Sequence, residues 1–382
     1  MKWLLALLLA GSAHAQHLSY LGQQIVPTSA TFRSLPAGGL SSIDYVPATG
    51  RYLAICDDRS DRGPARFYEL ALDLSQFRRS ADPGHAGVTW VDMTTLRDKN
   101  GQPFGRNRID PESLRLDAQR QLIYWADEGQ RSSAITEPPT LHRMHPDGTP
   151  AGDFTLPAHY RPTGSAGGLA AGDTGPHNNL AFESVALTPD GRTLWTMVEN
   201  GLAQDSLPAA QGQGSRARML SFDLDTGKAG AEYVYDVAPL PFPPAREGDF
   251  ATNGVPDMLA LSATEFIVIE RAYAVGAATP GRAALTGKPT STTIKLFRID
   301  TRGATDVSGW PSIKGRDVVP VKRSLLLDLS TLTNDDGSAL ALDNIEGITF
   351  GPMVDGKRTL ILVSDNNFNA AQFTQFIALS ID

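Results

Sequence analysis

Glutamates and aspartates recur in this sequence at the ends of short apolar runs, at a spacing that would gather carboxylates. Glu183 begins the apolar run 183–187, and Glu199 ends the run that follows the turn Pro189-Asp190-Gly191. If both runs are strands of one hairpin, the start of the first and the end of the second lie at the same end. Carboxylates brought together in this way bind divalent cations and act as general acids or bases. The pattern therefore indicates metal-assisted chemistry at one end of the hairpin.

The hairpin recurs along the chain, which indicates a repeat architecture. The first run of each unit begins at residue 41, 112, 183, 257 or 346, with spacings of 71, 71, 74 and 89 residues. Ser41 occupies that position in the first unit, and an acid occupies it in the others. A second run ends in an acid and a third run follows in every unit, and a fourth run follows in all units but the last. A spare apolar run occupies residues 18–26.

Four strands per unit at a regular period are typical of a β-propeller. We predict an all-β, five-bladed β-propeller with four-stranded blades, in one domain that covers residues 16–382. The N-terminal strand is expected to complete the last blade, which would close the ring and remove an exposed sheet edge. The alternative is six blades, with one unit too divergent to recognise.

The acids that begin the first runs form one column, and the acids that end the second runs form a second column. In a propeller the first strand of each blade lines the central channel, so both columns should lie at one rim of that channel. Catalytic carboxylates are expected at Glu112, Glu183, Glu199 and Glu346. Metal ligands are expected at Asp58, Asp127, Glu128, Asp257, Glu270 and Asp365. Oxygen ligands without histidine or thiolate favour Ca²⁺, with Mg²⁺ as the alternative. The expected substrate-binding residues follow directly on three of these acids and are Arg59, Arg271 and Asn366.

The N-terminus and the overall charge bear on where the protein works. Residues 1–15 have the features of a secretory signal peptide, with Lys2, the apolar run 3–10 and Ala13-x-Ala15. We therefore expect a periplasmic or secreted protein that has no membrane segment once the signal is removed. The formal net charge of −8 argues against nucleic-acid binding. We expect a monomer that acts on a small molecule.

Several segments of the chain resemble the phytase-like esterase domain family. They are GGLSSIDYVPATGRYLAICDDR, DPESLRL, AFESVALTPDGRTLW, VIER, NIEGITF and ILVSDNNF, and the resemblance covers roughly residues 34–381. Members of this family are exported bacterial proteins and some plant relatives. The family name implies activity on phosphate esters, with recurrent Glu and Asp residues proposed to do the chemistry. The matching positions are Glu112, Glu128, Glu183, Glu199, Glu270, Arg271, Glu346, Asp365 and Asn366.

Three functions fit these residues. The first is an exported phosphoester hydrolase that uses divalent cations held by the rim carboxylates, with arginines binding phosphate oxygens. The second is a non-catalytic propeller in which Ca²⁺ is structural and the large loops bind a ligand or partner. The third is a Ca²⁺-dependent lactonase or esterase. Propellers serve all of these uses, so the fold alone does not decide among them.

Overall fold

The computed structural model, which describes residues 17–381, is built almost entirely of short β-strands. The first blade contains β4 (Leu40–Val46), β5 (Arg51–Cys56), β6 (Arg66–Leu72) and β7 (Val88–Thr95). The second contains β8 (Pro111–Asp117), β9 (Leu122–Asp127), β12 (Thr140–Met144) and β13 (Pro150–Asp153). The third contains β14 (Phe182–Leu187), β15 (Thr193–Gly201), β16 (Ser215–Asp223) and β17 (Ala229–Val237).

The last two blades depart slightly from this plan. In the fourth, β18 (Ala251–Gly254) and β19 (Met258–Ala260) both pair with β20 (Glu265–Ala274), which is followed by β21 (Thr292–Asp300) and β22 (Lys322–Asp328). The fifth contains β23 (Asn344–Val354), β24 (Lys357–Asp365), β25 (Phe373–Ile381) and β1 (Leu18–Pro27). Outside the blades lie two short hairpins, β2 (Thr31–Phe32) with β3 (Leu35–Pro36) and β10 (Gln130–Arg131) with β11 (Thr136–Glu137). The helical elements are single 3₁₀ turns, η1 (Leu74–Gln76), η2 (Ala158–Tyr160), η3 (Ala166–Gly168) and η4 (Leu329–Thr331).

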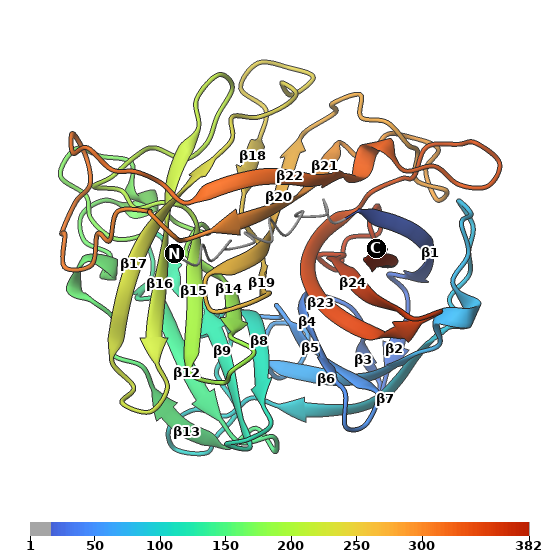
Figure 1. Cartoon of the computed structure of the whole chain (residues 1–382), viewed down its shortest axis with the longest axis horizontal. Coiled ribbons are helices and arrows are strands. Elements are labelled where there is room, and N and C mark those ends of the chain that lie inside the picture. The colour runs from blue at the N-terminus through green and yellow to red at the C-terminus, as the bar shows by residue number, and fades with distance from the viewer. Residues whose placement is uncertain (1–16, 382) are drawn as a thin grey trace, which may run out of the picture.

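The five sheets form a ring, which confirms the predicted five-bladed propeller and excludes the six-bladed alternative (Figure 1). Their inner strands β4, β8, β14, β19 and β23 contact one another in that order, and β23 returns to β4. The N-terminal strand closes the ring as predicted, because β1 pairs with β25 from Leu18 opposite Ile381 to Pro27 opposite Phe373. This pairing covers the edge that β25 would otherwise expose.

The core lies between neighbouring blades, where the apolar faces of adjacent sheets pack. Leu114, Val185 and Ile348, each on an inner strand, are fully buried. They alternate along the strand with residues that face the channel, as the period of two in a strand requires. Packing of this kind holds the inner strands in register around the channel.

A buried ion pair fills the place where the inner strands meet. Arg115 on β8 donates hydrogen bonds to both carboxylate oxygens of Asp257, at 3.0 and 2.9 Å. It also donates to Ser42 Oγ of the first blade at 2.8 Å and to the Ile348 carbonyl of the fifth at 3.1 Å. Asp257, which was expected among the rim ligands, therefore lies in the centre of the channel as the partner of Arg115.

Two further points concern membrane-spanning helices and the expected signal peptide. Within residues 17–381, no helix is long and apolar enough to cross a membrane. The expected signal peptide, residues 1–15, lies outside the described residues.

Candidate functional site

A cavity of about 970 Å³ opens at one end of the propeller. The acids that line it include Asp58, Glu112, Glu183, Glu346 and Asp365, which come from the predicted columns at the starts of first strands and the ends of second strands, together with Asp57. Arg59 and Arg271 line it as well. The structure thus brings together acids from four blades that are as far apart as residues 57 and 365 in sequence.

β-bulges direct the glutamates of the first column into this cavity. In β14 the pairing with β15 passes from Phe182 opposite Val198 to Ser184 opposite Met197, so Glu183 is the extra residue. The same shift leaves out Glu112 in β8 and Glu346 in β23. A bulged residue is released from the ladder and can be turned toward a site, and bulges are frequent next to active sites. The three glutamates of the first column therefore occupy equivalent bulges in their blades.

The fourth blade has a break at the equivalent position. Residues 255–257 separate β18 from β19, and the Ile269 N–H donates to the Asp257 carbonyl at 3.0 Å. The Asp257 side chain binds Arg115 and does not line the cavity. This local difference explains why one acid of the column departs from the others.

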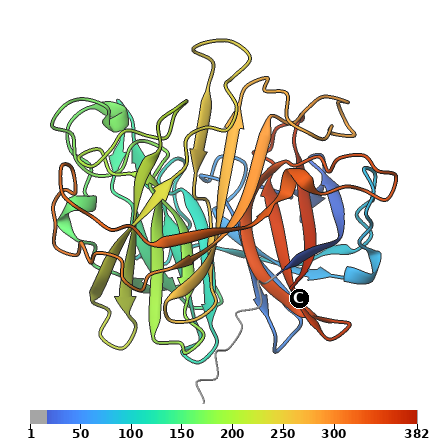
Figure 2. The ribbon, with the colours of Figure 1, turned by 45° about the horizontal axis from the view of Figure 1, so that its top comes forward.

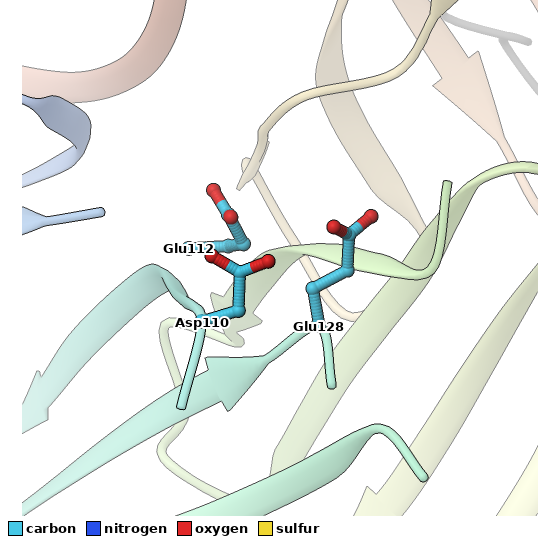
Figure 3. Close-up of side chains that lie close together, drawn as sticks. All are labelled: Asp110, Glu112 and Glu128. Atoms are coloured by element: carbon cyan, nitrogen blue, oxygen red, sulfur yellow. The ribbon is translucent and has the colours of Figure 1, made fainter. Parts of the chain in front are cut away.

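Three carboxylates, of which Glu112 lines the cavity, lie close enough to share a cation. Asp110, Glu112 and Glu128 each offer an oxygen, and these three oxygens lie within 4.8 Å of one another (Figure 3). All three side chains are buried. The backbone fixes them, because the Glu128 N–H donates to the Asp110 carbonyl at 2.9 Å and the Ala181 N–H donates to Glu128 Oε1 at 2.7 Å. This triad could hold a metal ion, and its all-oxygen donor set suits a hard divalent cation.

Two arginines contact the acids around the triad. Arg59 Nε donates to Asp110 Oδ1 at 2.7 Å, and its guanidinium also reaches Asn179 Oδ1 at 2.6 Å. Arg271 Nη2 donates to Glu199 Oε1 at 3.2 Å and to Glu346 Oε1 at 3.1 Å. The acids outnumber these cations, since the cluster comprises Asp57, Asp110, Glu112, Glu128, Glu183, Glu199, Glu346 and Asp365. Buried carboxylates in such excess are destabilising unless they are protonated or bind cations.

Burial and mutual repulsion raise the pKa values of this cluster. Desolvation is the largest cause, and it raises the pKa of Asp110 to about 7 and that of Glu346 to about 8, although Arg59 and Arg271 oppose the rise. The pKa of Glu112 is raised well above its usual range by burial and then by Glu183 and Asp110. The pKa of Glu183 is raised likewise, by burial and then by Glu128 and Glu199. Without a cation, the site therefore retains protons near neutral pH.

The cation-free protein should consequently lose stability as the pH rises. Asp110 and Glu346 keep protons up to about pH 7 and 8 in the folded state, whereas the unfolded chain releases them near 3.8 and 4.5. The folded state binds more protons in between, so its stabilisation is present at low pH and is lost as the pH rises through these values. We expect the urea midpoint in EDTA to fall between about pH 5 and 8. Glu346→Gln should flatten this dependence, and a midpoint that rises over the same interval would contradict the expectation.

Several acids of the predicted set have oxygens already bound elsewhere. Asp58 accepts from Arg66 Nη1 at 2.7 Å and from the backbone N–H groups of Asp61 and Arg62. Asp127 accepts from the Asp110 and Gly129 N–H groups, both at 2.9 Å. Neither belongs to the converging Asp110, Glu112 and Glu128, so we assign Asp58 and Asp127 a structural role and do not propose them as metal ligands.

Glu270 and Asn366 do not line the cavity, and both have fixed hydrogen-bond partners. Glu270 accepts from the Tyr235 hydroxyl at 2.6 Å and pairs with Arg323. Asn366 is fully buried, and its Oδ1 accepts from the N–H groups of Gly39 and Phe368. We do not propose that either residue binds substrate or a cation.

The structure adds Asp57 and Asp110 to the site, which the sequence alone did not single out. Asp57 precedes Asp58, and Asp110 precedes Pro111-Glu112 in the quoted motifs. Adjacent residues at a strand end face opposite sides, so of two neighbouring acids only one is expected to point into the channel. Two features of the sequence could have pointed to these residues: the adjacent acids at 57 and 58, and the acid two residues before Glu112.

Comparison with known proteins is consistent with this architecture. The model of the phytase-like family, described as "Esterase-like activity of phytase", matches residues 35–368. An uncharacterized secreted protein of Arthroderma benhamiae is 29% identical over 127 residues. That match covers 33% of this chain, and this chain spans only 24% of that relative.

Solved structures match this chain at low sequence identity and low TM-score. The Dos1 propeller has a TM-score of 0.34 at 8% identity, over 91% of this chain and 69% of that one. The RRP9 WD40 repeats have a TM-score of 0.40 at 8% identity, over 95% and 99%. The family match, in contrast, extends over most of the chain and includes every acid of the cavity. The chain therefore belongs to the phytase-like family described by the esterase-like activity of phytase.

Proposed function

We propose that this protein is an exported hydrolase of small phosphate esters that depends on a divalent cation, with Ca²⁺ as the preferred ion. The observation that carries the proposal is the excess of buried carboxylates over arginines in a cluster that forms part of the lining of an open cavity. Family membership supports a hydrolase-like propeller. The secreted relative supports export, since its name gives that location for a protein with a related segment.

Asp110, Glu112 and Glu128 are the residues that would hold the cation, because their oxygens already converge. A divalent cation bound there supplies Lewis-acid polarisation of a phosphoryl group and neutralises its charge. Its charge would also keep neighbouring carboxyl groups ionised, which reverses the upward pKa shifts of the cation-free site. Asp365, whose pKa burial raises to about 6, also lines the cavity and could provide a further oxygen.

Arg271 is placed to bind the phosphate itself. Its side chain is largely buried at the cavity wall, and its Nε has no hydrogen-bond partner within residues 17–381. A buried donor without a partner is unfavourable, and a phosphate oxygen would satisfy it. Arg59, whose guanidinium is held by Asp110 and Asn179, is the second candidate for a non-bridging oxygen.

Glu183 is the best candidate for the general base. It lines the cavity, and in the part of the chain that the structure describes it makes no hydrogen bond or ion pair. A carboxylate without a fixed partner can accept a proton from an attacking water. Glu183 would take that proton and Arg271 would stabilise the charge that develops on the phosphoryl oxygens.

Cation binding can be tested independently of catalysis. Binding to the folded state alone should stabilise it by RT ln(1 + [L]/Kd), or about 2.7 kcal/mol at a hundredfold excess of Ca²⁺ over Kd. Thermal scans of protein treated with EDTA and then with Ca²⁺ or Mg²⁺ would measure this. Identical melting curves would show that the acids do not form a cation site.

An activity screen tests the reaction class. Phosphomonoesters, phosphodiesters, carboxyl esters and lactones should be assayed with the purified protein, with and without EDTA. We expect hydrolysis of phosphate esters that EDTA abolishes. If only carboxyl esters or lactones are hydrolysed, the result favours the esterase or lactonase alternative over phosphoester hydrolysis. Ca²⁺ binding without any hydrolysis would favour the non-catalytic binding propeller.

A further inference from the structure

A pair of strands in the fourth blade runs from the acidic cluster to the mouth of the cavity. β18 pairs with β20 from Gly254 opposite Arg271 to Ala251 opposite Ala274. Gly254 lies against the Glu199 side chain, where a Cβ would collide with the carboxylate. Arg271 on the facing strand binds both Glu199 and Glu346. This end of the strand pair is therefore part of the acidic cluster.

The other end carries two aromatic side chains, Phe250 and Tyr273, which we call the aromatic shelf. Both line the cavity, and their ring centroids are 6.3 Å apart. Phe250 is 65% exposed, more than any other phenylalanine of the described residues. Exposure of such a ring to water is unfavourable, and aromatic rings at the mouths of pockets commonly contact ligands.

The aromatic shelf is held by the backbone hydrogen bonds between β18 and β20. The Val275 N–H donates to the Phe250 carbonyl at 3.0 Å, which extends the β18–β20 pairing by one residue pair. Next to it, Ser291 has a left-handed backbone with φ of 64°, held by a hydrogen bond from its N–H to Thr279 Oγ1 at 3.1 Å. A preformed surface of this kind loses little conformational freedom when a ligand binds.

The strand geometry sets the distance between the shelf and the cluster. Residues two or four apart on a strand face the same side, which places Tyr273 above Arg271 and Phe250 above Gly254. At about 3.3 Å per residue, the shelf lies roughly 7 to 13 Å from the acidic cluster. The two strands reach the upper part of the molecule in Figure 2, where β18 is yellow and β20 is orange. The phosphate would lie between them, on the cation and Arg271, so the remaining gap is shorter and suits a ring joined to phosphorus through an ester oxygen or a ribose.

We propose that the aromatic shelf binds a flat aromatic ring in the alcohol part of the substrate, so that aryl or nucleoside phosphate esters are preferred over esters of small polyols. The inference rests on the proposed function for the position of the phosphate. The polar floor takes the phosphate, and the apolar mouth takes the ring. Polyol phosphates lack a surface that could cover Phe250.

The test compares substrates with and without a ring, using the full mature chain loaded with Ca²⁺. Phe250→Ala is expected to raise KM for 1-naphthyl phosphate about tenfold, with kcat within about twofold and KM for glycerol 2-phosphate unchanged. Tyr273→Leu should act in the same direction. Adenosine 5′-monophosphate as a third substrate distinguishes nucleoside from aryl rings. Phe250 is exposed, so its replacement should not impair folding.

Phe242→Ala is the matched control, because Phe242 is also exposed, at 38%, and does not line the cavity. If Phe250→Ala leaves both KM values unchanged, or raises the KM for 1-naphthyl phosphate and for glycerol 2-phosphate equally, the aromatic shelf does not bind the ring. If neither substrate is hydrolysed, the proposed function fails, and calorimetric binding of 1-naphthyl phosphate then decides. Binding about tenfold weaker in Phe250→Ala would support the shelf, whereas unchanged or undetectable binding would refute it.

Discussion

Glu112→Gln is expected to lower both the cation affinity and the cation-dependent activity by about a hundredfold, equivalent to about 2.8 kcal/mol. Glu112 is the bulged residue of β8 and one of the three converging carboxylates. Glutamine keeps the volume of the side chain but removes its charge and one strong oxygen ligand. The loss should therefore appear as weaker binding of Ca²⁺ in calorimetry and as a higher Ca²⁺ concentration for half-maximal activity.

Stability should respond to Glu112→Gln in the opposite direction when EDTA is present. The pKa of Glu112 is raised by burial and by its neighbours, so the ionised form is unfavourable in the cation-free fold. Removing that charge should raise the melting temperature in EDTA, or leave it unchanged, and reduce the further rise that Ca²⁺ produces. A side chain with only a structural role would give a lower melting temperature in both conditions.

Two further variants locate the effect. Glu183→Gln should reduce kcat at least tenfold while Ca²⁺ affinity changes less, because Glu183 lies outside the triad. Glu69→Gln is the control, since Glu69 is on β6 and makes only a weak surface contact with Arg51, at 3.7 Å. If Glu112→Gln behaves like Glu69→Gln, the triad does not hold the cation.

The blades could be predicted from sequence because their signals are local and repeated. Each unit has apolar runs of strand length separated by turn residues, and the column position repeats at 71 to 74 residues in most of the chain. We predicted that residues 18–26 pair with the last blade because that blade has no fourth run of its own. In the structure, β1 is the fourth strand of that blade. Both inferences use only strand period and the need to cover a sheet edge.

The direction of individual acids depends on geometry that the residue types do not encode. Glu112, Glu183 and Glu346 enter the cavity because a bulge shifts the register at each position, whereas Asp257 follows a break between β18 and β19 and meets Arg115. The sequence patterns are alike in the four cases. Arg115 and Arg66 are buried and pair with Asp257 and Asp58, which is why we leave these two acids out of the proposed cation site.

Arg115→Met is expected to destabilise the protein by about 3–5 kcal/mol, which is the usual cost of leaving one partner of a buried ion pair without its countercharge. Asp257 is fully buried, and burial already raises its pKa to about 6 even with Arg115 in place. Without the guanidinium, Asp257 must take up a proton or remain charged in the core. The backbone carbonyls of Met258 and Ile348 would lose a donor at the same time.

Urea denaturation in EDTA separates this effect from cation binding. The double variant Arg115→Met with Asp257→Asn should recover part of the loss, because it removes the stranded charge, and the two single changes should not be additive. Arg51→Met is the control, since the Arg51–Glu69 contact is at the surface and should contribute less than about 1 kcal/mol. Arg115 is three residues from Glu112 on β8 and binds groups of the first, fourth and fifth blades. A loss as small as that of Arg51→Met would mean that packing between blades alone holds the inner strands, and that the ion pair is not needed to keep the bulged glutamates together.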